Sequence, residues 1–327
     1  MNIAVIGLGS MGKRRIRLIK EMYPDYVLYG VDSRKDRREE TEKNFRVKCF
    51  GSLEEIAANQ IGTSVDCVFV CTSPLSHNAI IKDVLQRGCH VFTELNLVDD
   101  GYKENQQLAT EKGLKLFLSS TFFYREEIKY IRSRICFGKK YNYIYHIGQY
   151  LPDWHPWESY KDFFLGDKRT NGCREIMAIE FPWLVGTFGD VIDMRILSDK
   201  MTDLHIDYND NYMIQLTHVD GHKGCLIVDV VSPCAVRKLE IYSENAYLSW
   251  NGTPESLSEF NPDTKLLETV TLYEKTEHAE GYTAFVVENA YKNEIKEFFD
   301  VVLKNKESLY GFGQDQKTLQ LINTIGA

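Results

Sequence analysis

The sequence lacks the features that would place it in a membrane, a secretory pathway or a nucleic-acid complex. Its longest apolar runs are far shorter than the roughly 20 residues that a membrane helix needs. The N-terminus leads directly into a strand-like segment, without the basic segment, apolar stretch and cleavage site of a signal peptide. The net charge of −8 is accompanied by no basic stripe. We therefore expect a cytoplasmic protein with no membrane or nucleic-acid partner.

Paired cysteine motifs are also missing. The eight cysteines include no CxxC pair and are scattered along the chain, several of them in strand-like apolar runs. This distribution indicates reduced, mostly buried thiols, and we expect no metal site. The chain of 327 residues is long for one hydrophobic core, so two domains are expected.

The first 32 residues carry the most informative pattern. An apolar strand, residues 3–6, leads into Gly7, Gly9 and Gly12, and an acidic residue follows at position 32. Gly7 permits a tight turn, Gly9 lets the backbone approach a pyrophosphate, and Gly12 lets the next helix pack closely on the sheet. The helix is predicted over residues 11–22, with Ser10 and Met11 at its start, where unpaired amides favour an anion. The pattern predicts a dinucleotide site.

Asp32 decides which dinucleotide is favoured. A carboxylate at the end of the second strand accepts both ribose hydroxyls of the adenosine and repels a 2′-phosphate. We therefore predict NAD as the cofactor. Arg34 and Lys35 follow Asp32 directly and offer charges that could hold a phosphate, so NADP stays an alternative.

Strand and helix patterns alternate up to about residue 120, which indicates a parallel α/β sheet. Ligands in such sheets lie beyond the carboxyl ends of the strands, so the residues at those ends should line one crevice. Ser52, Ser76 and Asn78 are interpreted as helix caps. The basic residues of the first helix, Arg14, Arg15 and Arg17, are interpreted as a solvated face or as charge near a phosphate. The predicted strand-end residues are Asp32, residues 72–77, Glu94 and residues 119–121.

Four segments together resemble the glucose–fructose oxidoreductase, inositol dehydrogenase and MocA-type (Gfo/Idh/MocA) family. In order they are GLGSMG, VFVCTSPLSHNAII, GCHVFTELNLV and LFLSSTFFYREE. The resemblance implies a Rossmann domain, residues 1–120, followed by an α+β domain, residues 121–327, with a large, mostly antiparallel sheet. Its C-terminal helices can pack back on the first domain. It also implies an NAD(P)-dependent oxidation or reduction of a sugar, inositol or nucleotide-sugar, in a homodimer or homotetramer.

The resemblance assigns roles to several residues and is broken at others. It implies that Thr72, Ser73 and His77 contact the ribose and nicotinamide side of the cofactor and that Glu94 lies near the nicotinamide ribose. The lysine of the family's Glu-Lys-Pro motif is replaced by Leu95. In the second domain, the family's catalytic histidine is replaced by Glu180. A shift of one residue in this alignment would place Glu175 at the family's aspartate.

Hydride transfer to or from an alcohol carbon needs a group that accepts or donates a proton. Glu180, in an apolar run, is our first candidate, because burial can raise the pKa of a carboxylate toward neutrality. The alternative is a salt bridge between Glu180 and Arg174 or another cation. His155 is the second candidate, and the alternative is a loop histidine bonded to backbone.

Aromatic and charged side chains in the second half suggest a small polyhydroxylated substrate. Trp154 and Trp157 offer flat apolar faces for a sugar ring, although for either ring alone packing between domains is the favoured explanation. Arg174 could pair with an anionic group. Thr121 and Glu175 complete the predicted substrate site. Two other functions stay open: a dinucleotide-binding protein that has lost the chemistry, suggested by Leu95, and an NAD-assisted dehydration or epimerisation.

Overall fold

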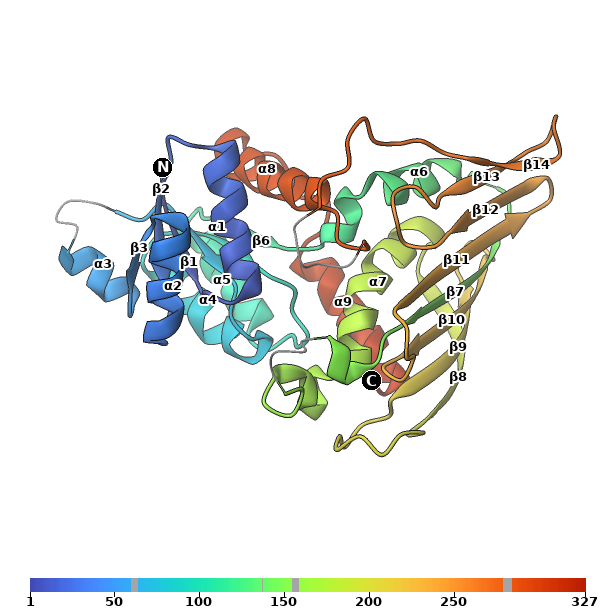
Figure 1. Ribbon diagram of the computed structural model, residues 1–327, viewed down its shortest axis with the longest axis horizontal. Helices are drawn as coiled ribbons and strands as arrows, with labels where there is room; N and C mark the ends of the chain where they lie inside the picture. Colours follow the sequence, from blue (N-terminus) through green and yellow to red (C-terminus); the bar gives the residue numbers. More distant parts are fainter. Residues whose placement is uncertain (60–63, 137, 155–158, 279–283) are drawn as a thin grey trace. The chain divides into compact units, whose positions relative to one another are not determined.

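The computed structural model describes residues 1–59, 64–136, 138–154, 159–278 and 284–327 (Figure 1). The chain divides into two compact units. Unit 1 consists of Met1–Ser120 and Tyr291–Gln316, and unit 2 of Thr121–Ala290 and Lys317–Ala327. Within the described ranges, no helix combines the length and the apolar character that a membrane span requires.

Unit 1 contains a six-stranded parallel sheet in the order β3-β2-β1-β4-β5-β6. The strand order reverses between β1 and β4, and the carboxyl ends of the strands at such a point form the usual ligand crevice. The doubly wound sheet predicted for this half is confirmed. Its strands are β1 (Asn2–Ile6), β2 (Val27–Val31), β3 (Lys48–Phe50), β4 (Cys67–Val70), β5 (His90–Thr93) and β6 (Leu116–Leu118).

Helices cover this sheet, and one of them comes from the far end of the chain. Phe69, Phe92 and Phe117 stack across β4, β5 and β6, with neighbouring ring centroids 4.6 and 5.2 Å apart. Phe298 of α8 meets all three rings edge-on. The core of unit 1 is therefore completed by a segment almost 200 residues downstream of β6, as the positions 118 and 298 show. The helices are α1 (Ser10–Met22), α2 (Lys35–Phe45), α3 (Leu53–Asn59), α4 (His77–Gln86), α5 (Tyr102–Glu111) and α8 (Glu288–Lys304).

Unit 2 is built on an eight-stranded sheet in the order β14-β13-β12-β11-β7-β10-β9-β8. All neighbours are antiparallel except β7 and β10, so the predicted large, mostly antiparallel sheet is confirmed. Figure 1 shows α7 (Gly172–Phe188) lying beside this sheet. The strands are β7 (Asn142–Gly148), β8 (Val191–Asp199), β9 (Asn211–His218), β10 (Lys223–Asp229), β11 (Val236–Ser243), β12 (Ala246–Trp250), β13 (Ser258–Asn261) and β14 (Leu266–Thr269).

The two faces of this sheet differ. Alternate side chains of β7, such as Tyr143 and Tyr145, are buried, and Tyr145 packs against Trp183 of α7. The intervening positions face outward and include the exposed apolar residues Ile144 of β7 and Met213 of β9. The remaining helices are α6 (Glu126–Arg134), α9 (Phe312–Ile325) and the short 3₁₀ helices η1 (Pro74–Ser76), η2 (Thr121–Tyr124), η3 (Leu151–Asp153), η4 (Phe164–Gly166) and η5 (Lys168–Thr170).

Several local expectations need correction. The Ser52 hydroxyl accepts the Glu55 N–H at 3.4 Å, as a cap should. The hydroxyl of Ser76 instead donates to Thr72 Oγ1 and the Ser73 carbonyl, and the Asn78 amide oxygen accepts from Asn105, so neither residue caps a helix with its side chain. Both side chains bond to these groups in place of the free amides at the start of the helix.

Two arginines and two cysteines also differ from expectation. Arg14 and Arg15 are buried, so the solvated face expected for the first helix is wrong at these positions. Three cysteines are buried and three are half-buried, but Cys136 and Cys234 are exposed. No two of the eight form a disulfide.

Candidate functional site

The glycine turn between β1 and α1 is shaped by two contacts that exclude any side chain. Gly7 has a φ of +91°, and a Cβ there would lie 2.6 Å from the carbonyl oxygen of Cys71. A Cβ on Gly12 would lie 1.9 Å from the carbonyl oxygen of Gly7. A Cβ on Gly9 would meet only the side chain of Arg37, at 3.8 Å. The fold therefore requires Gly7 and Gly12. Packing inside the protein does not require a glycine at position 9, so the missing side chain there leaves room for a ligand.

Asp32 is buried at the end of β2 and oriented by two backbone amides. The N–H of Leu8 donates to Asp32 Oδ2 and that of Arg34 donates to Oδ1, both at 2.8 Å. Each carboxylate oxygen keeps a lone pair for a further donor. The Arg34 side chain forms an exposed ion pair with Asp36 at 2.6 Å. Such a surface pair is worth only about 0–1 kcal/mol. Ser10 and Met11 form the first turn of α1.

His77, at the start of α4, is buried and bonded through both ring nitrogens. Nε2 lies 2.9 Å from the Thr72 carbonyl and Nδ1 2.5 Å from Asn96 Oδ1. Burial lowers the pKa of His77. The ring therefore fixes the backbone at the end of β4, where the Ser76 hydroxyl also holds Thr72 Oγ1 at 2.7 Å. Ser73 precedes η1 at the same strand end.

Glu94, at the end of β5, is part of a buried charge cluster. Arg15 donates to both of its carboxylate oxygens, at 2.6 and 3.1 Å. The same guanidinium donates to Glu294 of α8 at 2.7 Å, and its Cζ lies over the Phe92 ring, 4.5 Å from the ring centroid. The Ser119 hydroxyl donates to Glu294 at 2.9 Å. Coulombic attraction by the two carboxylates raises the pKa of Arg15 against the opposing effect of burial.

This cluster links the glycine-turn helix to the ends of β5 and β6. Arg15 is on α1, which starts in the turn, and the Ser120 N–H also donates to Glu294, at 2.8 Å. The carboxylate of Glu94, assigned by resemblance to the nicotinamide ribose, is thus already held by Arg15. Leu95 is half-buried and brings no charge to this strand end.

In unit 2, Glu180 lies fully buried in α7 with three donors around its carboxylate. The Tyr145 hydroxyl and the Trp183 indole N–H donate to Oε2 at 2.8 and 2.7 Å. Arg237 of β11 forms a short ion pair with Oε1 and also donates to the Tyr145 oxygen at 2.7 Å. The structure therefore has the salt bridge weighed for Glu180, with Arg237 as the cation. Arg174 is not the partner, because its guanidinium donates to the Ala327 carbonyl at 2.7 Å.

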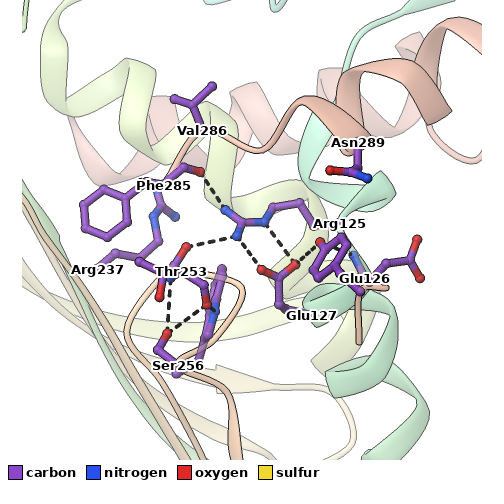
Figure 2. Close-up of polar contacts among 12 residues, drawn as sticks. Arg125, Glu126, Glu127, Arg237, Thr253, Ser256, Phe285, Val286 and Asn289 are labelled. Carbon is purple, nitrogen blue, oxygen red and sulfur yellow. Dashed lines mark hydrogen bonds and ion pairs between the residues drawn. The ribbon is translucent and has the colours of Figure 1, made fainter. Parts of the chain in front are cut away.

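A second buried arginine stands near Arg237 (Figure 2). Arg125 pairs with Glu127 and donates to the carbonyls of Phe285 and Gly252, both at 2.9 Å. The Tyr273 hydroxyl donates to Glu127 at 2.6 Å. These bonds tie the start of α6 to two distant loops of unit 2. No motif in the sequence indicated Arg125 or Arg237, because each pairs with residues far away along the chain.

The remaining predicted residues of unit 2 lie in the first turn of α7, just after η3 and in η2. The Asn171 side chain caps the helix by accepting the Arg174 N–H at 2.8 Å. Glu175 is half-buried, and burial raises its pKa to about 7. Trp154 donates its indole N–H to the Gln149 carbonyl at 3.0 Å. Thr121 begins η2 and is half-buried.

Two predicted residues, His155 and Trp157, lie outside the described residues. Among the residues that the structure does describe, no group of three or more His, Cys, Asp or Glu side chains is arranged to hold a metal ion.

Comparison of the sequence with known proteins finds matches over part of the chain. Residues 1–120 match the model of an oxidoreductase family with an NAD-binding Rossmann fold. Biliverdin reductase A of Mus musculus is 29% identical over 140 residues, which are 42% of this chain and 45% of that protein. Myo-inositol 2-dehydrogenase of Thermotoga maritima is 34% identical over 105 residues, 30% of each chain. The matches thus span less than half the length of these relatives.

The whole chain has structural neighbours. A levoglucosan dehydrogenase in complex with NADH and L-sorbose superposes with a TM-score of 0.80 at 14% identity, covering 100% of this chain and 96% of that one. At this level of identity the similarity shows a shared two-domain fold.

Proposed function

Because residues 1–120 match the model of an oxidoreductase family with an NAD-binding Rossmann fold, we propose that this chain is an NAD-dependent oxidoreductase of the Gfo/Idh/MocA type that transfers a hydride to or from a carbon of a small polyhydroxylated compound. Sugars, inositols and nucleotide-sugars are the substrate classes that we favour. The cofactor supplies the hydride chemistry when it is bound. The residues of this chain bind and orient the cofactor and the substrate, and one of them moves a proton.

The observation that carries the proposal is the asymmetry among the three glycines. Gly7 and Gly12 are required by contacts inside the protein, but a Cβ on Gly9 would approach no backbone atom within 4 Å. An open position in front of the amides of α1 is what a bound pyrophosphate needs. The pattern therefore supports a turn that is shaped for a ligand as well as for the fold.

The choice of NAD rests on Asp32. Its carboxylate is fixed by Leu8 and Arg34 and keeps lone pairs for the two ribose hydroxyls. A 2′-phosphate at this place would meet the buried carboxylate of Asp32 and be repelled by it, although Arg37, 3.8 Å from Asp32 Oδ2, weakens that repulsion. Arg34 and Arg37 are the residues whose charges could accept the 2′-phosphate of NADP.

The main alternative is a protein that binds a dinucleotide but catalyses no reaction, because Leu95 supplies no proton donor. An ionisable group in α7 favours the enzyme, because burial brings the pKa of Glu175 to about 7, where a carboxyl group can both accept and donate a proton. Net-redox-neutral dehydration or epimerisation uses the same cofactor site and differs only in its products.

Two experiments test the proposal. Calorimetric titration with NAD and NADP, each oxidised and reduced, is expected to show binding, with NAD the tighter. The protein is then incubated with NAD or NADH and a panel of inositols, anhydrosugars, aldoses, ketoses and nucleotide-sugars while the nicotinamide absorbance is followed. Turnover of at least one compound is expected.

The possible outcomes separate the candidate functions. Absence of binding by either cofactor would overturn the whole proposal. Binding without any change in absorbance, and without any new product by mass spectrometry, would favour the protein that only binds. A new product at constant absorbance would favour dehydration or epimerisation.

We also propose that two or four copies of the chain associate through the outer face of the unit 2 sheet. Ile144 and Met213 are 43% and 49% exposed on that face, and large exposed apolar patches commonly mark contact surfaces. Light scattering is expected to give the mass of a dimer or tetramer. A monomer at micromolar concentrations would refute this assembly.

A further inference from the structure

The two carboxylates of α7 differ in what they can still bind. Glu180 accepts hydrogen bonds from Tyr145 and Trp183 and forms an ion pair with Arg237, and none of its surface is exposed. A proton acceptor needs a lone pair that can be reached by the proton it takes. The geometry around Glu180 leaves no approach for a substrate hydroxyl.

The carboxylate of Glu175, unlike that of Glu180, is not taken up by hydrogen bonds from the described residues. Among the residues that the structure describes, none donates a hydrogen bond to its carboxylate or pairs with it. Glu175 lies with Ile179 and Gly186, at positions i, i+4 and i+11, along one side of α7. These three residues are half-buried, half-buried and exposed, whereas Pro182 between them is buried. The carboxylate is therefore shielded by its surroundings but is not occupied by them.

The helical turn just before Glu175 packs close to an aromatic ring. Helical side chains lean toward the N-terminus of their helix, so Glu175 leans toward the turn that contains Gly172. A Cβ on Gly172 would lie 3.7 Å from the ring of Trp154 and 3.2 Å from Leu151. Any other residue at position 172 would press against these side chains. The first turn of α7 thus combines an apolar ring face with an unoccupied carboxylate, a combination suited to a sugar ring and its hydroxyl group.

We propose that Glu175 is the acid–base group of the reaction and that Glu180 is a positioning residue, which holds Tyr145, Trp183 and Arg237 together behind α7. This inference rests on the proposed oxidoreductase function. In the oxidative direction the substrate hydroxyl gives its proton to the Glu175 carboxylate, the hydride of the same carbon passes to NAD⁺, and a C=O bond forms. The reverse steps reduce the carbonyl. Burial, which raises the pKa of Glu175 to about 7, suits both directions near neutral pH.

Glu175→Gln tests the inference, because it keeps the size of the side chain and removes its acid–base capacity. With a compound from the panel, kcat is expected to fall about 10²–10⁴-fold, which is the usual range for a proton-transferring group, while NAD affinity and Tm stay those of the wild type. Formate is expected to restore part of the activity of Glu175→Ala, because a small carboxylate fits the space left by the side chain. Glu104→Gln is the matched control: Glu104 also lies in the first turn of a helix, α5, but is exposed.

A readout that needs no turnover accompanies the kinetics. Difference infrared spectra of the cofactor-free protein between mildly acidic and mildly alkaline pH are expected to show one protonated carboxyl band that titrates near neutrality. The band should be lost in Glu175→Gln and kept in Glu104→Gln.

The results separate this inference from the function on which it rests. If wild-type protein turns a compound over and Glu175→Gln retains its kcat, the function stands and the role of Glu175 is refuted. Formate rescue of Glu180→Ala, with none for Glu175→Ala, would likewise transfer the role to Glu180. If wild-type protein turns nothing over, the function fails and the role of Glu175 fails with it.

Discussion

Alanine substitutions at Gly9 and Gly12 should separate what the glycine turn does for the fold from what it does for the ligand. At Gly12 the new methyl group would sit 1.9 Å from a backbone oxygen, so the turn or the helix must shift. At Gly9 the same group meets only the movable end of Arg37, at 3.8 Å. We expect Gly12→Ala to destabilise the protein without cofactor, and Gly9→Ala to impair cofactor binding with little effect on the free protein.

The magnitudes differ enough to be measured. Overpacking typically costs about 1–3 kcal/mol, and because the atom met by the Gly12 methyl group is backbone, the upper end is expected. For units of this size that corresponds to a fall in Tm of roughly 6–12 °C. Gly9 stands at the N-cap of α1 with a φ of −74°, which alanine tolerates. Exchanging an N-cap glycine for alanine should cost at most about 1 kcal/mol, or roughly 2–4 °C.

Thermal unfolding with and without NAD is the assay. At a concentration about 100-fold above its Kd, NAD should stabilise the wild type by about 2.7 kcal/mol. If the alanine methyl group at position 9 weakens binding about 100-fold, the gain falls to about 0.4 kcal/mol. The reasoning would be refuted by a Gly9→Ala protein whose Tm rises with NAD as the wild type's does, or by a Gly12→Ala protein with unchanged stability.

Three further predictions concern buried charges. Arg15→Met should lower the free energy of unfolding by about 3–5 kcal/mol, because it leaves two buried carboxylates without their cation. Urea unfolding of the Arg15→Met/Glu294→Gln double variant tests this cause. A smaller loss of stability than in Arg15→Met would support it, and an equal loss would contradict it. Arg237→Met should lower the free energy of unfolding by about 3 kcal/mol, because it leaves the buried Glu180 carboxylate without its cation. Substitution of the exposed neighbour, Lys238→Met, should change it by less than about 0.5 kcal/mol. Similar unfolding midpoints for the two variants would contradict this prediction. Burial lowers the pKa of His77 and of His218, so the unfolded chain binds protons more readily below its own histidine pKa of about 6.5. Acidification below that pH should therefore destabilise the fold through these histidines, whereas protonation of Glu175, whose pKa burial raises to about 7, should stabilise it. Glu175→Gln, which lacks this stabilising contribution, should accordingly lose more Tm than the wild type between about pH 7 and about pH 5, and an equal or smaller loss would contradict this.

The sequence was sufficient for features in which neighbouring residues determine one another. The strand, glycine turn and acidic residue of the first 32 positions lie within one local unit, so periodicity and glycine spacing predicted them directly. The same holds for the alternation of strands and helices up to residue 118.

What the sequence could not provide are pairings between distant positions. Glu180 looked like a free acid in an apolar run, and its neutralising partner, Arg237, lies 57 residues away on β11. Arg15 looked like one of several exposed basic residues of an amphipathic helix, until Glu294 from the far end of the chain was seen to bind it. The cap expected at Asn78 failed for a related reason, because its partner Asn105 lies 27 residues away. Ser76 instead bonds to Thr72 and Ser73, four and three residues before it.

The discontinuity of unit 1 bears on how the chain reaches its final form on the ribosome. Its parallel strands are complete once residue 118 has been synthesised, yet Phe298 and Glu294, which cover the aromatic stack and neutralise Arg15, emerge last. Until then the nascent sheet presents bare rings and a solitary guanidinium. A ribosome-stalled chain ending near residue 285 should consequently resist protease less well, and recruit chaperones for longer, than one released at full length.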